Sequence, residues 1–158
     1  MTDQHPSPDR APLLGLLLRI VHQQWHDEVS AALAERGFDD IKPAHANVFP
    51  FVPDEGITAT DLAERAGVRK QSMAQSLDEL EGLGYLIRRP APNDRRARLV
   101  FLLPRGIELR PVGRAAGRRV EKRWASIIGA EALEDLRATL LGLASGDPDG
   151  GGSPKQSA

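Results

Sequence analysis

The chain has 158 residues, enough for one compact domain with a hydrophobic core, and a formal net charge of −1. It contains no cysteine, which excludes disulfides, thiolate metal sites and cysteine-based redox sensing. The charge is unevenly distributed, because residues 1–56 carry 4 basic and 9 acidic side chains and residues 57–110 carry 10 and 7. The modest positive excess of the middle region supports contact with nucleic acid there.

Residues 1–10 are predicted to be disordered, and a long helix follows from about Pro12 to Arg36. An apolar seam of roughly 3.5-residue spacing runs along it, formed by Leu14, Leu18, Val21, Trp25, Val29, Ala32 and Leu33. The seam is too long for one small core, which predicts a partner helix; packing against the C-terminal helices is the alternative, and both can hold. The apolar run at 13–18 is too short to span a bilayer and lacks a leader or cleavage pattern, so we expect a cytoplasmic protein.

His22 and His26 lie four residues apart on one face of this helix, a spacing that suits metal ligation. Further ligands could come from Asp27, Glu28 and His45. The zinc-protease pattern, however, requires Glu directly after the first His, and Gln23 stands there. Since the sequence also has no nucleophile elbow or phosphate-binding loop, we expect neither an enzyme nor a bound metal or cofactor.

Pro43 is predicted to open a short helix over residues 44–49, which Pro50 and Pro53 limit. Two further helices follow within residues 60–83, joined at Gly67, a residue that tolerates positive φ. Thr58 or Thr60 can cap the first of them.

The second of these helices covers residues 69–83 and has one apolar and one polar face. Met73, Leu77 and Leu80 share the apolar face. The polar face is formed by Gln71, Ala74, Gln75 and Asp78, with Lys70 and Ser72 beside it. Gln pairs with adenine, Ala contacts the thymine methyl, and Lys or Ser reaches guanine or phosphate, so this face suits DNA.

Acidic Asp78, Glu79 and Glu81 crowd the C-terminal half of the same helix, so we expect only its first two turns to enter a groove. The alternative is an ordinary helical hairpin whose polar face is simply solvated.

A basic hairpin comes next, with strands at 85–89 and 97–103 and a turn at 90–96. Its five arginines are Arg88, Arg89, Arg95, Arg96 and Arg98. They suit a phosphate backbone or a narrow minor groove better than a protein core. Helix, turn, helix and basic hairpin together predict a winged helix-turn-helix.

A helix is predicted over residues 104–128, with Pro111 kinking or interrupting it. Its basic face comprises Arg114, Arg118, Arg119, Lys122 and Arg123. This face could approach phosphates or pair with the acidic N-terminal helix; the alternative is that it is simply solvated. A last helix covers 130–144, and the tail at 145–158 has the composition of a disordered segment.

Several segments resemble the MarR family of bacterial regulators: 62–68, 77–81, 84–86, the Asn93–Leu102 wing and the Arg105-Gly106 pair. The resemblance spans roughly residues 12–144. It implies a mainly α fold with a small β-hairpin wing, with the winged helix-turn-helix at 43–103 and a helical dimerisation region at 11–42 and 104–144. The chain departs from the family at Leu103, where Thr is common, and at Arg69, where a capping Ser is common.

The resemblance also implies site residues. Arg95 would enter the minor groove, oriented by Asp94, with Arg96 and Arg98 nearby, and the recognition helix would use Arg69, Lys70, Gln71, Ser72 and Gln75. Effectors would be small phenolic or lipophilic anions in a cleft walled by His22, Trp25, His26 and His45, although aromatic packing is the alternative for these rings.

We therefore expect a homodimeric, sequence-specific regulator that binds a pseudo-palindromic DNA duplex, as a repressor that a small molecule releases. The alternative is a winged-helix module that docks another protein and never binds DNA.

Overall fold

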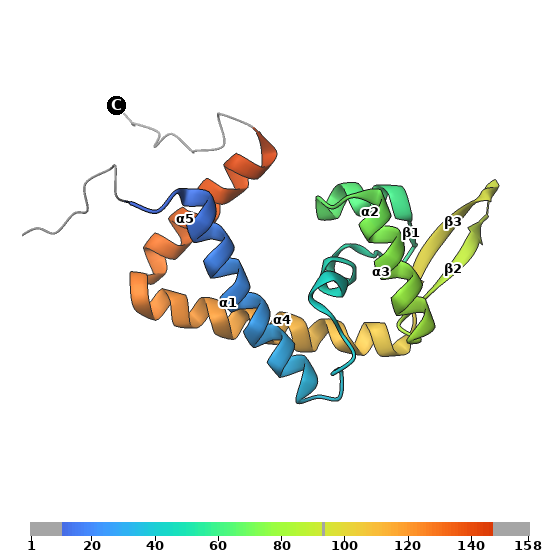
Figure 1. Ribbon diagram of the computed structural model, residues 1–158, viewed down its shortest axis with the longest axis horizontal. Helices are drawn as coiled ribbons and strands as arrows, with labels where there is room; N and C mark the ends of the chain where they lie inside the picture. Colours follow the sequence, from blue (N-terminus) through green and yellow to red (C-terminus); the bar gives the residue numbers. More distant parts are fainter. Residues whose placement is uncertain (1–10, 93, 147–158) are drawn as a thin grey trace, which may run out of the picture. The chain divides into compact units, whose positions relative to one another are not determined.

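The structure is a computed structural model that describes residues 11–92 and 94–146 and, at Arg95, the main chain alone. It divides into two compact units, Met1–Gly117 and Arg118–Ala158, and one long helix passes from the first unit into the second (Figure 1). The predictions of disorder for residues 1–10 and for most of the tail lie outside the described residues.

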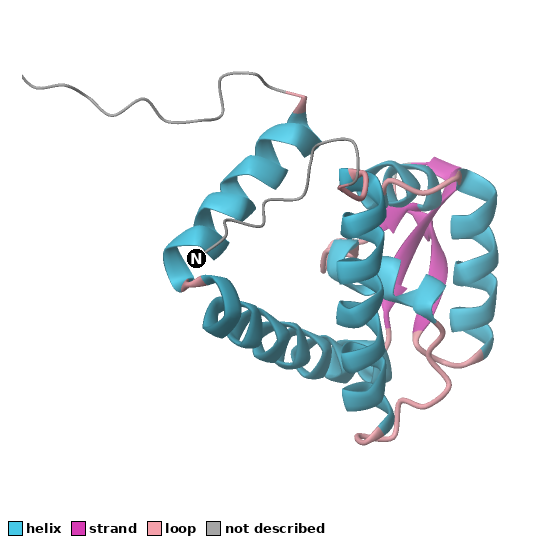
Figure 2. Cartoon of the chain, turned by 60° about the vertical axis from the view of Figure 1, so that its left-hand side comes forward, coloured by secondary structure: helices cyan, strands magenta, loops and turns pink. Residues whose placement is uncertain are grey.

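The chain is mainly helical, as predicted (Figure 2). In chain order the elements are α1 (Leu14–Ala34), η2 (Pro43–Asn47), η3 (Phe49–Phe51), β1 (Ile57–Thr58), α2 (Ala59–Ala66), α3 (Lys70–Gly82), β2 (Leu86–Ala91), β3 (Asp94–Leu102), α4 (Pro104–Ile128) and α5 (Ala130–Ser145).

The helix-turn-helix of α2 and α3 forms as the sequence predicts. The Thr58 side chain caps α2 by accepting from the Asp61 backbone N–H over 3.1 Å, and Gly67 ends α2 in the left-handed conformation at φ +64°. Met73, Leu77 and Leu80 on α3 are all buried to 1% exposure or less. Burying these three side chains on one face leaves the opposite face of α3 in solvent.

The wing belongs to a three-stranded antiparallel sheet in the order β1-β3-β2 (Figure 2). β1 pairs Ile57 with Val100; it has only two residues, too few for a periodic signal in the sequence. The prediction of a turn over 90–96 was wrong, since β2 runs to Ala91 and β3 begins at Asp94. Pro90 is tolerated because β2 is an edge strand, and the backbone N–H groups on its outer edge have no partner strand to bond.

A buried cluster joins the start of the wing to the loop after α1 and to α4. The Tyr85 ring is fully buried and its hydroxyl donates to Asp40 Oδ1 over 2.5 Å. Arg105 on α4 stacks over the Tyr85 ring at 4.3 Å and pairs with Asp40 at 3.0 Å. Burial and the bond to Asp40 raise the pKa of the Tyr85 hydroxyl, so it stays a protonated donor.

Two local predictions differ from the structure. The segment expected as a helix over 44–49 forms two 3₁₀ turns, η2 and η3, because Pro50 cannot supply an amide to continue a helix. Pro111 does not interrupt α4, which is continuous from Pro104 to Ile128. Arg110 holds this region by donating to the Phe49 carbonyl over 3.0 Å and to the Val52 carbonyl, and Leu109 is buried in the core. These contacts offset the hydrogen bond that proline removes.

The second unit contains the end of α4 and the whole of α5. Arg137 on α5 donates to Glu121 on α4 over 2.9 Å and pairs with Glu134 within α5. The unit leaves large apolar side chains in solvent, namely Ile127, Ile128, Leu136, Leu140, Leu141 and Leu143. No helix of the described ranges is long and apolar enough to cross a bilayer.

Two glycines in α4 provide a matched pair of substitutions. A Cβ at Gly106 would lie 2.4 Å from the Tyr85 carbonyl oxygen, a backbone atom, whereas a Cβ at Gly113 would meet nothing within 4 Å. We expect Gly106→Ala to destabilise the fold by about 1–3 kcal/mol because the backbones must move apart. Gly113→Ala should stabilise it by roughly 0.5–1 kcal/mol through helix propensity. Urea unfolding followed by circular dichroism measures both, and equal effects would contradict the close approach of α4 to Tyr85.

Candidate nucleic-acid interface

The first two turns of α3 present a polar surface to solvent. Its exposed side chains are Arg69, Lys70, Gln71, Ser72, Ala74 and Gln75. Arg69 is the N-cap and makes no side-chain cap hydrogen bond, so the first amides of α3 have no partner from the cap residue. Free amides at the positive end of a helix dipole attract anions such as phosphate.

Glu79, the central one of three acidic residues in the second half of α3, is paired. Glu79 accepts hydrogen bonds from Lys42 Nζ and from His45 Nε2, each over 2.8 Å, and from Gln75 Nε2 over 3.2 Å. The bonds from Lys42, His45 and Gln75, in that order, lower the pKa of Glu79 to about 2. The carboxylate is therefore ionised at neutral pH, and its charge is matched by a cation from outside α3.

Arg88 on β2 pairs with the other two acidic residues of α3. It binds Glu81 through Nε at 2.9 Å and Nη2 at 2.6 Å, and Asp78 through Nη2 at 2.6 Å. Its backbone N–H donates to Glu81 as well, over 2.9 Å. The side-chain and backbone hydrogen bonds from Arg88 lower the pKa of Glu81. The expectation that Arg88 serves a phosphate contact is therefore wrong, because its guanidinium is held by carboxylates of its own chain.

The wing carries its tip arginines in a bulge of β3. The register changes from Pro90↔Arg98 to Ala91↔Asp94, so residues 95–97 lie opposite no residue of β2. Asp94 Oδ1 accepts from the Arg96 backbone N–H over 2.9 Å, and Arg98 Nη2 donates to the Arg88 carbonyl over 2.9 Å. The Arg95 side chain lies outside the described residues, so its predicted ion pair with Asp94 stays a prediction.

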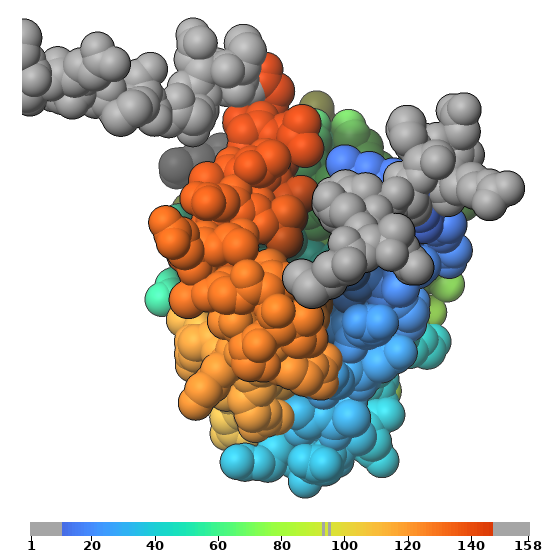
Figure 3. Space-filling model, turned by 90° about the vertical axis from the view of Figure 1, so that its left-hand side faces the viewer, coloured from blue at the N-terminus to red at the C-terminus, as the bar shows by residue number. Residues whose placement is uncertain are grey.

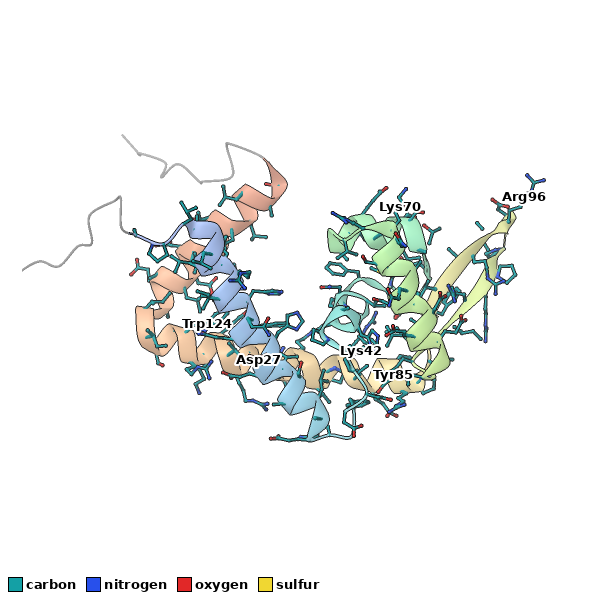
Figure 4. All side chains as sticks on the ribbon, in the orientation of Figure 1. Asp27, Lys42, Lys70, Tyr85, Arg96 and Trp124 are labelled. Carbon is teal, nitrogen blue, oxygen red and sulfur yellow. The ribbon has the colours of Figure 1, made fainter. Side chains whose placement is uncertain are left out.

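Lys70 and Arg96 point into solvent from α3 and from the far end of the hairpin (Figure 4). Both lie at the upper edge of that view, while Lys42 and Tyr85 lie lower, toward the other end of α3. The first unit therefore presents two separate cationic elements, a helix start and a hairpin tip.

The rings predicted to bind an effector separate into two groups. His22, Trp25 and His26 cluster on α1, with ring centroids 6.3 Å apart for His22–Trp25 and 4.7 Å apart for His22–His26. His26 is buried, and burial followed by the neighbouring His22 lowers its pKa. His45 lies in η2 and uses both ring nitrogens for Lys42 and Glu79. Among the residues that the structure describes, no three His, Asp or Glu side chains form a metal site.

The partners of the α3 carboxylates were not predicted from the sequence. Lys42 and His45 lie 37 and 34 positions before Glu79, and no local spacing relates residues at such a separation. One signal was available: Arg88 lies near three carboxylates in sequence, and an arginine at the foot of a wing has acidic residues within reach. The polar face of α3 was correctly located because helical periodicity alone determines it.

Helix-turn-helix, three-stranded sheet and arginine-bearing hairpin define a winged helix-turn-helix protein. The family model described as MarR family matches residues 39–97, which contain η2, α2, α3 and the start of the wing. Solved structures agree with this match. A MarR family transcriptional regulator from Rhodococcus sp. RHA1 has a TM-score of 0.70 at 25% identity, with 90% of this chain and 96% of that chain covered.

CouR from Rhodococcus jostii RHA1, solved with p-coumaroyl-CoA, has a TM-score of 0.70 at 25% identity over 85% of this chain and 95% of that one. The transcriptional repressor CouR, solved on a 23-mer DNA duplex, has a TM-score of 0.69 at 24% identity over 84% of this chain and 92% of that one. Residues 39–97 of the chain thus match the MarR family, and the fold is similar to that of solved MarR family transcriptional regulators.

Arg88 and Arg89 are neighbours of equal charge with different surroundings, since Arg88 binds Asp78 and Glu81 and Arg89 is exposed. We expect Arg88→Met to lower the free energy of unfolding by about 1 kcal/mol, a value discounted for solvent screening at this half-exposed site. Arg89→Met should change it by less than about 0.5 kcal/mol. Thermal unfolding at neutral pH compares the two. A loss of equal size in both variants would show that the pairing does not hold β2 to α3.

Proposed function

We propose that the chain is a cytoplasmic, homodimeric, sequence-specific DNA-binding regulator, a repressor released by a small molecule. The observation that carries this proposal is the pairing of Asp78, Glu79 and Glu81 with Arg88, Lys42 and His45. Unpaired, these carboxylates would repel a phosphate backbone that approached α3. Because Arg88 and Lys42 offset most of this negative charge, the free amides and Lys70 dominate the electrostatic field at the start of α3.

In this arrangement two parts of the chain, the start of α3 and the tip of the wing, would contact DNA. The start of α3 suits the major groove, where Gln71 and Gln75 reach base edges, and Arg96 in the bulge of β3 suits phosphates or a minor groove. CouR, which shares the fold, is described as a repressor and was solved on a DNA duplex, and this supports the assignment of the same two elements here.

Homodimer formation is supported by apolar surface that the chain alone leaves in solvent. The first half of α1 and the residue before it carry side chains that are 41–83% exposed: Leu13, Leu14, Leu16, Leu17, Leu18, Ile20 and Val21. Part of α1 is visible in blue in Figure 3. The later seam residues Val29, Ala32 and Leu33 are buried in the first unit. A continuous apolar strip of this length on a monomer marks an interface, and α5 carries a second one.

An effector is the remaining part of the proposal. The cluster of His22, Trp25 and His26 combines aromatic surface with ring nitrogens, a combination that suits phenolic or other aromatic anions. CouR was solved with p-coumaroyl-CoA, an aromatic thioester, which supports this ligand class. Release from DNA requires only that the ligand bind the DNA-incompetent state more tightly.

The decisive experiment is selection of bound sequences from a random duplex pool by the purified full chain. We expect an inverted repeat whose half-sites lie one helical turn apart, about 34 Å, because a two-fold dimer places two α3 helices at that spacing. Recovery of unrelated sequences, together with a monomeric chain in sedimentation, would refute both the dimer and the specific binding.

Salt dependence separates this function from a winged-helix module that binds only protein. Affinity for the selected duplex should fall steeply with salt, and Arg96→Ala should reduce the slope of log K against log salt by about 1 per wing. Gln75→Ala should leave the slope unchanged and relax sequence preference. A chain that binds no duplex even at low salt would favour the protein-docking alternative.

Titration of phenolic acids and their CoA thioesters into the protein–operator complex tests the effector. We expect at least one compound to release DNA. Trp25→Ala should weaken that response without changing operator affinity, because Trp25 lies on α1 among His22, His26 and Gly117, outside the proposed DNA-binding residues. Gln24→Ala, an exposed neighbour on the same helix, is the matched control. If no compound of either class displaces DNA, the proposed ligand class is wrong.

A further inference from the structure

Gln75 is joined to a hydrogen-bonded chain that starts outside α3. Its Nε2 donates to Glu79 Oε1 over 3.2 Å, one helical turn along. The other oxygen of that carboxylate, Oε2, accepts from Lys42 Nζ and from His45 Nε2, each at 2.8 Å. Since both oxygens of Glu79 are engaged, the carboxylate cannot rotate without breaking at least one of these bonds.

The chain ends on a buried ring. His45 is 1% exposed, and its Nδ1 accepts from the Lys42 backbone N–H over 3.2 Å. A nitrogen that accepts carries no proton, so a neutral ring places its proton on Nε2 and donates it to Glu79. Lys42 Nζ, in contrast, approaches from solvent, because this side chain is 65% exposed. Glu79 is therefore held by one buried and one exposed donor from the 42–45 segment.

An ionised carboxylate accepts hydrogen bonds and donates none. The bonds from Lys42, His45 and Gln75 lower the pKa of Glu79 to about 2. At neutral pH the carboxylate is therefore ionised and can only accept hydrogen bonds. The end of the Gln75 amide that faces Glu79 must then be its NH₂ group, and the flipped amide would place two acceptors together. The Gln75 oxygen and its second N–H remain available.

We propose that Glu79 is a positioning residue that fixes the amide orientation of Gln75, so that the base this side chain reads depends on the 42–45 segment. The inference rests on the proposed DNA-binding function. An amide with one free N–H and one free oxygen in a fixed order matches the N7 acceptor and N6 donor of adenine. Fixing that order before binding removes part of the side-chain entropy that recognition would otherwise cost.

The test uses the duplex selected by the full-length chain and all single base-pair changes of its half-site. Gln75→Ala should lose discrimination at one base pair by about 5- to 150-fold, the range of one bidentate contact. Glu79→Gln should lose part of it at the same base pair, on the order of 3- to 10-fold, because its amide no longer dictates which end of Gln75 faces it. In the Gln75→Ala background, Glu79→Gln should cause no further loss.

Glu64→Gln is the matched control, because Glu64 is an exposed carboxylate on α2 and the substitution changes the net charge equally. Both Glu→Gln variants should change affinity for all duplexes alike through charge, and only Glu79→Gln should alter the ratio between duplexes. If Glu79→Gln does not fold, Lys42→Met replaces it, since this substitution removes the exposed donor and leaves His45 in place. It should lower discrimination at the same base pair.

A measurement without DNA follows the contact itself. The two side-chain amide protons of Gln75 should have separate, well-dispersed NMR signals in the wild type, and Glu79→Gln should move them toward the positions of a free glutamine. Unchanged signals, or a discrimination ratio equal to that of the wild type, would overturn the proposal. A wild-type chain that binds duplex without any sequence preference would instead overturn the proposed function and leave the amide contact intact.

Discussion

The structure depends on hydrogen-bond donors from outside α3 that hold the three carboxylates in its acidic half. Asp78 and Glu81 bind Arg88 from β2, and Glu79 binds Lys42, the N-cap of η2, and His45 within η2. Each ion pair is partly exposed to solvent, so it contributes little stability by itself. The larger effect is on the electrostatic field around α3, because cationic residues lie at its start and the negative charge at its end is largely offset by Arg88 and Lys42. A polyanion approaching α3 is thereby directed to its first two turns.

The same pairs hold α3 in place on two sides. Arg88 ties it to the wing, Lys42 and His45 tie it to the segment after α1, and its apolar face is buried in the core. Below it, the Tyr85 hydroxyl, Asp40 and Arg105 connect the start of the wing with α4. Helix and wing therefore keep one geometry, because moving either would break several contacts at once.

Features that depend on local periodicity could be predicted from the sequence. Features that depend on contacts between residues far apart in the chain could not. The apolar and polar faces of α3, the Thr58 cap and the Gly67 corner follow from spacing and from residue conformation, and the structure confirms them. The length of the wing was underestimated because Pro90 reads as a strand breaker, whereas an edge strand accepts it. Pro111 was expected to kink or interrupt α4; the helix is not interrupted there, and Arg110 holds it through hydrogen bonds to two distant carbonyls. The partners of Arg88 and Glu79 required the tertiary fold.

A rigid helix and wing also restrict how such a protein can be controlled. If α3 were loosely attached, a ligand could act by distorting it within one chain. Here α3 is held by hydrogen bonds on both sides and by its buried apolar face. Distorting it locally would therefore break several hydrogen bonds together. In the proposed dimer, the less costly change is the spacing between two intact copies, which the apolar strips on α1 and α5 would determine. A ligand near the rings of α1 then needs no contact with DNA-binding residues, since it alters affinity by favouring one spacing over the other.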